Sequence, residues 1–256
     1  MSAMAISWIV FACVFGGALL GMFLRAVLPD HHVSTDSKDI IKLGMGVIGT
    51  MAAIVLGLLI AAAQGSFREQ RSEIIQLSAN IIFLDRVLDN YGPETKEARD
   101  LLRSAVVQTL NQMWPEDSSQ PAQLDPTASK AEFLLDKIQA LSPQNETQRS
   151  LQAQAQSLAF NLVQARWLMF VQQQQVKSIP VPFLIVLAVL LFWFTTVFFG
   201  FGLFAPSNAT IIAILVVSAL SISGAIFLMV ELFQPFEGLL RIPSDPLRDA
   251  LAYLGR

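Results

Sequence analysis

The sequence predicts an all-α membrane protein with four transmembrane helices and a cytoplasmic helical domain inserted between the second and the third. Four apolar stretches predict the spans, because each approaches or exceeds the roughly 20 apolar residues that cross about 30 Å of hydrocarbon as a helix. They cover residues 6–28, 43–63, 182–204 and 210–233. The composition agrees, since 54% hydrophobic and 14% charged residues make a chain of 256 residues too apolar for a soluble domain.

Charged residues separate these apolar stretches from a polar tract. Most of them lie between Ser66 and Ser178, where acidic and basic side chains are nearly balanced. Such a tract is typical of a folded polar domain. We therefore expect a first transmembrane hairpin over residues 1–65, a cytoplasmic helical domain over 66–179, a second transmembrane hairpin over 180–234 and a cytoplasmic tail over 235–256.

The polar tract has a helical period and lacks strand-like alternation of useful length. Apolar residues recur at three- and four-residue spacing from Phe67 to Leu88, which predicts that the second span continues into the cytoplasm as one helix. Gly92 and Pro93 predict where this helix ends. Three further helices are predicted over residues 94–114, 128–141 and 146–178.

Basic residues predict the orientation of the chain in the membrane. With four spans, both termini lie on the same side as the polar domain. That side carries Arg68, Arg71, Arg166, Lys177, Arg241 and Arg248, whereas the first loop on the other side carries Arg25, Lys38 and Lys42. The positive-inside rule therefore predicts that the domain and both termini are cytoplasmic.

Several classes of function are disfavoured by the residues present. A net charge of -3 without a cluster of Lys and Arg argues against a nucleic-acid partner. The single cysteine, Cys13, allows no intrachain disulfide. His31 and His32 in the outer loop are interpreted as solvated side chains rather than as a metal site. Because neither a phosphate-binding loop nor a nucleophile with a histidine in range is found, we expect no enzyme, no metal and no cofactor.

Small residues in the first two spans indicate close helix packing. In the second span, Gly46, Gly49 and Gly57 are interleaved with alanine and β-branched residues, and Gly17 with Gly21 forms a small-xxx-small face in the first. The spacing fits packing within one subunit, and it also fits a helix that lines a pore. The spacing alone favours packing.

Another face of the second span combines a row of three residues with a positive charge. Thr50, Ile54 and Leu58 are spaced by four and stack along one side of the helix, and Lys42 lies at the outer end of the same row. If several copies of this helix surround an axis, the row forms a narrow apolar neck below a ring of positive charge. Apolar constrictions gate by dewetting, and a basic ring favours anions.

Four segments carry a resemblance to a known family. The segment IVLGL at residues 54–58 resembles the second-span segment that lines the pore neck of bestrophins, which are anion channels, and ELFQPFE at 231–237 resembles the turn after their last span. Over nearly its full length the chain looks more like a bacterial bestrophin-like family of unassigned activity. With that family it shares FGLFAPSNAT at 201–210 and PFEGLLRIPSDPLRDAL at 235–251.

The resemblance implies a homo-oligomer in a bacterial inner membrane, with a pentamer suggested by the bestrophins. Its second span would line a pore for inorganic ions, with the neck at Thr50, Ile54 and Leu58. Pro235 and Phe236 carry the match to the turn after the last span.

Two further features concern gating. Glu231, the carboxylate within a span, is interpreted either as a functional group or as the ion-pair partner of Arg241 or Lys177. No acidic cluster follows Phe236, so the residues of the bestrophin calcium clasp are missing, and residues 65–67 replace the aromatic pair that ends the second bestrophin span. We therefore do not expect calcium gating.

Three classes of function fit the chain. The first is a homo-oligomeric ion channel for anions. The second is a membrane-anchored scaffold or sensor whose cytoplasmic helices bind a partner, since spans that carry little charge fit an anchor equally well. The third is a transporter, which requires broken helices and a polar site at the midplane. Pro180 and Pro182 flank a span without interrupting it, so this class ranks last.

Overall fold

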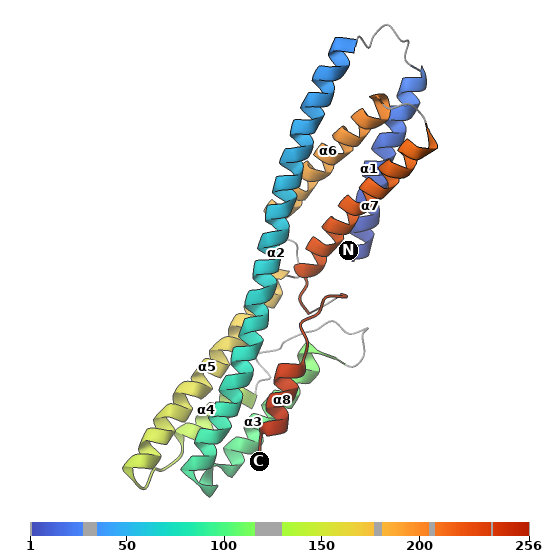
Figure 1. Ribbon diagram of the computed structural model, residues 1–256. Helices are drawn as coiled ribbons and strands as arrows, with labels where there is room; N and C mark the ends of the chain where they lie inside the picture. Colours follow the sequence, from blue (N-terminus) through green and yellow to red (C-terminus); the bar gives the residue numbers. More distant parts are fainter. Residues whose placement is uncertain are drawn as a thin grey trace. The chain divides into compact units, whose positions relative to one another are not determined.

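A computed structural model describes residues 2–27, 35–115, 130–176, 181–204, 208–236 and 238–255. These residues form the helices α1 (Ala3–Val27), α2 (Thr35–Tyr91), α3 (Lys96–Met113), α4 (Lys130–Gln139), α5 (Glu146–Val176), α6 (Val181–Phe204), α7 (Ala209–Leu232) and α8 (Asp245–Tyr253), with a 3-10 turn at Pro93–Thr95 (Figure 1). The described residues contain no strand. The predicted all-α class is confirmed.

Among the described residues, four helices are long and apolar enough to cross a membrane. They are the segments Ala3–Val27, Asp39–Tyr91, Phe183–Phe204 and Ala209–Leu232. Each predicted apolar stretch overlaps one of these segments. The helix that holds the second stretch is 57 residues long, and no proline interrupts it before Pro93.

The chain divides into two compact units. The first unit comprises Met1–Ser66 and Ile179–Phe233, and the second comprises Phe67–Ser178 and Gln234–Arg256. Helix α2 contributes its first part to the first unit and its last part to the second.

In the first unit, α1 packs along α6 and α7 (Figure 1). The core between these helices includes Val14 of α1, Leu190 of α6 and Ala219 of α7. Glycines allow the close approach of α1 and α6: a Cβ added at Gly21 would overlap the carbonyl oxygen of Phe199, and one added at Gly202 would overlap that of Ala18. Packing of small residues replaces the hydrophobic drive that is absent between helices in lipid.

In the second unit, α3 packs against α4 and α8, and α4 packs against α5. The core is built from apolar residues of α3, α4, α5, α8 and the last part of α2. Among them are Leu84, Leu102, Ile138, Leu162 and Leu247. Burial of this apolar surface is the main force that holds the helices together.

A glycine turn joins α2 to the helices that follow. Gly92 has φ +134°, a value that side chains rarely allow, so glycine is required at this corner. The hydroxyl of Thr95 donates to the carbonyl of Leu88 at 2.6 Å and to that of Gly92 at 2.8 Å, which satisfies acceptors at the end of α2. The predicted end of the second helix at Gly92 and Pro93 is confirmed.

The tail after α7 contains a helix that the sequence analysis did not predict. In α8, Leu247 and Ala250 are buried in the second unit. The preceding segment is also anchored there: the indole Nε1 of Trp114 donates to the carbonyl of Ile242 at 2.9 Å. A proline near the start of α8 and apolar residues at three- and four-residue spacing, ending at Leu254, are the signals that could have revealed this helix.

Candidate functional site

The row of residues proposed as a pore neck lies on an uncovered face of α2. Ile54 is 53% exposed and Leu58 is 66% exposed in the single chain, and Thr50 is exposed as well. On the opposite side of the same helix, Ala52 and Leu56 are buried in the core of the first unit. The row is therefore open to lipid, to a pore or to another subunit.

Thr50 adds little polarity to this row. Its hydroxyl donates to the carbonyl of Gly46, one turn earlier in the same helix, at 2.8 Å. Because this bond satisfies the hydroxyl within the helix, Thr50 needs no polar partner on the exposed face. Together with Ile54 and Leu58 it forms a mostly apolar strip.

The glycines of the first two spans have different surroundings. A Cβ added at Gly17 would lie 2.9 Å from Cγ2 of Thr195, so this residue, like Gly21, permits the contact of α1 with α6. At Gly46, Gly49 and Gly57 of α2, no atom of the described residues lies within 4 Å of an added Cβ. Packing within one subunit thus accounts for Gly17 and Gly21 of α1 and not for these three glycines of α2.

Lys42 stands beside a carboxylate that the sequence analysis did not consider. Its Nζ lies 3.7 Å from Oδ1 of Asp39, and both side chains are largely exposed. An exposed pair at this spacing is weak, yet it reduces the net positive charge at this end of α2. The i,i+3 spacing of the two residues on one helix was the signal for this pair.

The residues proposed for gating lie at the end of α7 and in the tail. Glu231 is buried, with 4% of its surface exposed, in the last turn of α7. Pro235 is also buried, and its carbonyl accepts a hydrogen bond from the Ile242 amide at 2.8 Å. The ring of Phe236 meets Trp114 edge to face at 6.1 Å between centroids. Lys177, one of the two ion-pair partners considered for Glu231, lies outside the described residues.

A network of ion pairs connects α2, α3 and the end of the chain in the second unit. Arg99 donates to the buried carboxylate of Asp85 through Nε at 2.8 Å and Nη2 at 3.2 Å, and to Asp89 through Nη1 at 2.5 Å. The amide of Gly255 donates to Asp85 Oδ2 at 3.3 Å, and Arg103 donates to the carbonyl of Leu254 at 3.2 Å. Hydrogen bonds with Asp85 and the negative charges of Asp85 and Asp89 raise the pKa of Arg99, against the opposing effect of its partial burial.

An open cleft of about 520 Å³ lies beside this network, lined by charged residues of both signs. Because Asp85 and Asp89 accept from Arg99, and Arg103 donates to the tail, these groups already hold the fold together. We interpret the network as a clamp that fixes the tail on α2 and α3. The described residues contain no group of three His, Cys, Asp or Glu that could hold a metal ion. His31 and His32 lie outside them.

Comparisons with known proteins identify the family of this chain. A family model described as the bestrophin-like domain matches residues 12–247. A crystal structure of a mutated bacterial bestrophin homologue from Klebsiella pneumoniae resembles the fold with a TM-score of 0.67 and 15% sequence identity, over 97% of this chain and 98% of that one. No curated protein matches. Since the family model matches nearly the whole sequence, the chain belongs to the bestrophin-like family.

Proposed function

We propose that this protein is a homo-oligomeric ion channel that conducts anions through a pore lined by α2. The observation that carries the proposal is the match of the bestrophin-like domain over residues 12–247, because bestrophins are anion channels. The similarity to the Klebsiella homologue, over almost the full length of both chains, supports the same architecture.

The exposed face of α2 supports the choice of the pore helix. Thr50, Ile54 and Leu58 are uncovered in the single chain, and the nearby glycines have open space beside them. Copies of α2 placed around an axis would form a constriction from this row, and apolar constrictions of this kind gate by dewetting. Lys42 would lie at the pore mouth and favour anions, while Asp39 beside it would moderate that preference.

The same proposal sets the topology. Four spans cross the bacterial inner membrane, with both termini and the second unit in the cytoplasm, as the distribution of basic residues favours. Five copies would surround the pore, by analogy with bestrophins. The hydrogen bond from Ile242 to Pro235 and the contact of Phe236 with Trp114 would hold Pro235 and Phe236 within the second unit.

Chloride flux into liposomes tests the proposal. The purified protein is reconstituted, and chloride uptake is compared with sodium and potassium uptake under matched gradients, with protein-free liposomes as the control. The proposal predicts chloride uptake well above the control and above the uptake of either cation. Equal uptake of all three ions would contradict the proposed anion selectivity. A folded oligomer without any ion flux would argue against a channel.

A further inference from the structure

The segment between α7 and α8 is closed at its base by hydrogen bonds (Figure 1). The amide of Ile242 donates to the carbonyl of Pro235 at 2.8 Å, and both residues are buried. The indole of Trp114, at the end of α3, donates to the carbonyl of Ile242 at 2.9 Å. Gly238 has φ +83°, a left-handed value that glycine adopts without strain, so the chain can turn back toward this base. The segment is therefore a loop whose base is fixed in the second unit.

Two leucines and an arginine are exposed on this loop. The side chain of Leu239 is 73% exposed, that of Leu240 is 39% exposed, and no large apolar side chain among the described residues of the second unit is more exposed than Leu239. Arg241 is exposed as well, and none of the ion pairs among the described residues includes it. Glu237, which comes before Gly238, lies outside the described residues. Single exposed leucines are common on proteins, whereas neighbouring apolar side chains beside a cation are typical of segments that bind a membrane surface.

The chain keeps this loop close to the end of a candidate span. Helix α7 is long and apolar enough to cross a membrane, and its 24 residues extend about 36 Å, against about 30 Å of hydrocarbon. Its last residue, Leu232, is therefore expected in or next to the headgroup layer. Leu239 follows seven residues later, and seven residues span at most about 25 Å. Because Pro235 and Ile242 are joined, this part of the chain is not fully extended, so the leucines of the loop are within reach of the headgroups.

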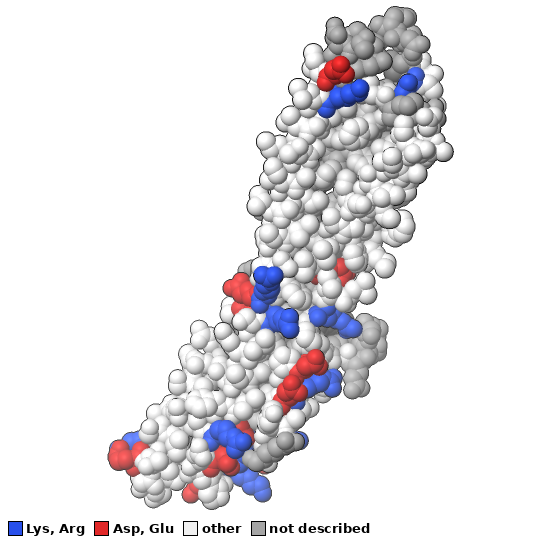
Figure 2. Space-filling view, in the orientation of Figure 1, with Lys and Arg blue, Asp and Glu red and all other residues white. Residues whose placement is uncertain are grey.

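The surface of the spans indicates which phase the loop can enter. On the face shown in Figure 2, the spans present an almost uncharged surface, as contact with lipid requires. Val217 and Leu220 of α7, which are 63% and 56% exposed, belong to the apolar surface of the spans. The bilayer that covers such side chains is also the apolar phase within reach of Leu239 and Leu240. Their burial in lipid requires no additional partner.

We propose that Leu239 and Leu240 insert into the bilayer surface beside α7 and that Arg241 binds the phosphates of phospholipid headgroups. The inference rests on the topology of the proposed function, in which α7 crosses the membrane, and it adds a contact with lipid outside the four spans. Apolar side chains bury at the boundary between headgroups and acyl chains, while the long side chain of an arginine reaches the phosphates and binds them through its planar set of donors. Since Trp114 holds the base of the loop, this contact would tie the second unit to the membrane surface.

Fluorescent labels at single cysteines test this contact in the full-length protein. In a Cys13→Ala background, a bimane maleimide is attached to Leu239→Cys, and the protein is reconstituted in phosphatidylcholine vesicles with or without lipid that carries a nitroxide near its headgroup. Val217→Cys and Leu220→Cys of α7 are the lipid controls, and Asp100→Cys, whose natural carboxylate is exposed, is the water control. The proposal predicts that nitroxide lipid quenches the label at Leu239→Cys about threefold more strongly than the label at Asp100→Cys, and that aqueous iodide quenches it less.

Two further substitutions, each combined with the label at Leu239→Cys, test the chemistry of the contact. Leu240→Asp should lower the quenching by nitroxide lipid to that of the water control, because a carboxylate is costly to bring into hydrocarbon. Arg241→Glu should reduce this quenching about twofold or more, since phosphates repel the new charge. Arg248→Glu, which reverses an exposed arginine of α8 outside the loop, should leave it unchanged. Circular dichroism confirms that each variant keeps its helices. The same quenching in all these variants would contradict the insertion of the loop.

The lipid controls separate a failure of this inference from a failure of the proposed topology. If iodide alone quenches the label at Leu239→Cys while nitroxide lipid quenches both labels on α7, the loop lies in water and this inference alone is overturned. A label at Leu239→Cys that neither quencher reaches would also overturn it, because protein would then cover the loop. If nitroxide lipid quenches neither Val217→Cys nor Leu220→Cys, the position of α7 in the membrane is wrong, and the proposed topology fails together with this inference.

Discussion

Ser7 of α1 and Ser223 of α7 exchange hydrogen bonds. The hydroxyl of Ser223 donates to the carbonyl of Ser7 at 2.6 Å, and the hydroxyl of Ser7 donates to the carbonyl of Ser223 at 3.1 Å. Their Oγ atoms lie 2.8 Å apart. In lipid, such bonds hold two helices together where hydrophobicity does not. The pair therefore links α1 directly to α7, and both partners belong to these two helices.

Removing one of these hydroxyls should loosen the first unit. We expect Ser223→Ala to lower the stability of the protein by roughly 0.5–1.5 kcal/mol, the usual range for hydrogen bonds between helices in membranes. Thermal unfolding in detergent measures the effect. Ser221→Ala is the matched control, because Ser221 is exposed and its hydroxyl donates to Val217 of its own helix. Equal losses in the two variants would show that the contact between α1 and α7 contributes nothing.

The glycine contacts between α1 and α6 lead to a second prediction. Gly202→Ala should force these helices apart, because the added methyl group would overlap the backbone of Ala18. Backbone shifts of this kind typically cost about 1–3 kcal/mol. Gly16→Ala should have little effect, since no described atom lies within 4 Å of its added Cβ. The comparison is read from the thermal midpoints of the purified variants, and a Gly202→Ala protein as stable as Gly16→Ala would contradict the close approach.

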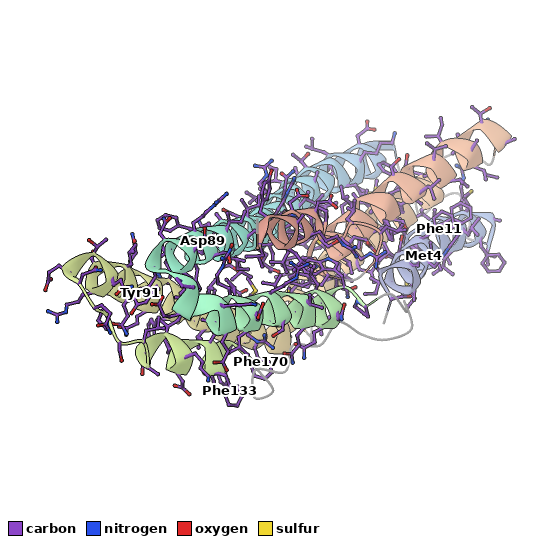
Figure 3. The ribbon with its side chains drawn as sticks, turned by 90° about the horizontal axis from the view of Figure 1, so that it is seen from below. Met4, Phe11, Asp89, Tyr91, Phe133 and Phe170 are labelled. Carbon is purple, nitrogen blue, oxygen red and sulfur yellow. The ribbon has the colours of Figure 1, made fainter. Side chains whose placement is uncertain are left out.

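Tyr91 at the end of α2 predicts a dependence of stability on pH (Figure 3). Its hydroxyl is buried and has no hydrogen-bond partner among the described residues. Burial raises the pKa of Tyr91 above its ordinary value of 10.0, and the charge of Glu94 acts in the same direction. The unfolded chain therefore loses this proton first as the pH rises. The stability that the neutral phenol contributes is complete below pH 10 and decreases above it.

Tyr91→Phe should remove the part of the loss of stability at alkaline pH that the ionisation of Tyr91 causes. At pH 8 the variant should be as stable as the natural protein or slightly more so, because a buried hydroxyl without a partner is lost. Between pH 8 and pH 11 its unfolding free energy should decline less. Tyr253→Phe, at an exposed position, should behave like the natural protein. The same decline in all three proteins would show that Tyr91 does not titrate as its burial implies.

The pair of Lys42 and Asp39 predicts opposite changes in ion selectivity. Lys42→Gln should lower the permeability ratio of chloride to sodium, and Asp39→Asn should raise it, because each variant removes one of two neighbouring charges at the proposed mouth. Each effect should be roughly two- to fivefold, since a unit charge at about 4 Å in water is worth ~1 kcal/mol. Reversal potentials in asymmetric salt measure the ratio. Unchanged potentials in both variants would place the mouth elsewhere.

Much of the fold follows from local sequence signals. The apolar stretches, the end of α2 at Gly92 and the long helix that begins at Glu146 depend on hydrophobicity and helix breakers, which act within a few residues. Helix α8 is short and gains its stability from burial of Leu247 and Ala250 against α3, so its length did not reveal it.

The site depends more on tertiary structure. Gly17 and Gly57 belong to similar sequence patterns, yet one contacts Thr195 and the other has no described atom within 4 Å of an added Cβ. Only the arrangement of helices decides between these surroundings. Likewise, the spacing of Ile54 and Leu58 showed that they share a face of α2, whereas the structure shows that this face is uncovered.

Single-channel current in planar bilayers tests most directly the claim that α2 lines an anion pore. Chloride conductance is compared for the natural protein, Ile54→Ala, Leu58→Ala and the control Leu220→Ala, which shortens an exposed leucine of α7. We predict that Ile54→Ala and Leu58→Ala change conductance or selectivity, because each widens the apolar neck, and that Leu220→Ala does not. Natural currents in all three variants would contradict the assignment of the neck to α2.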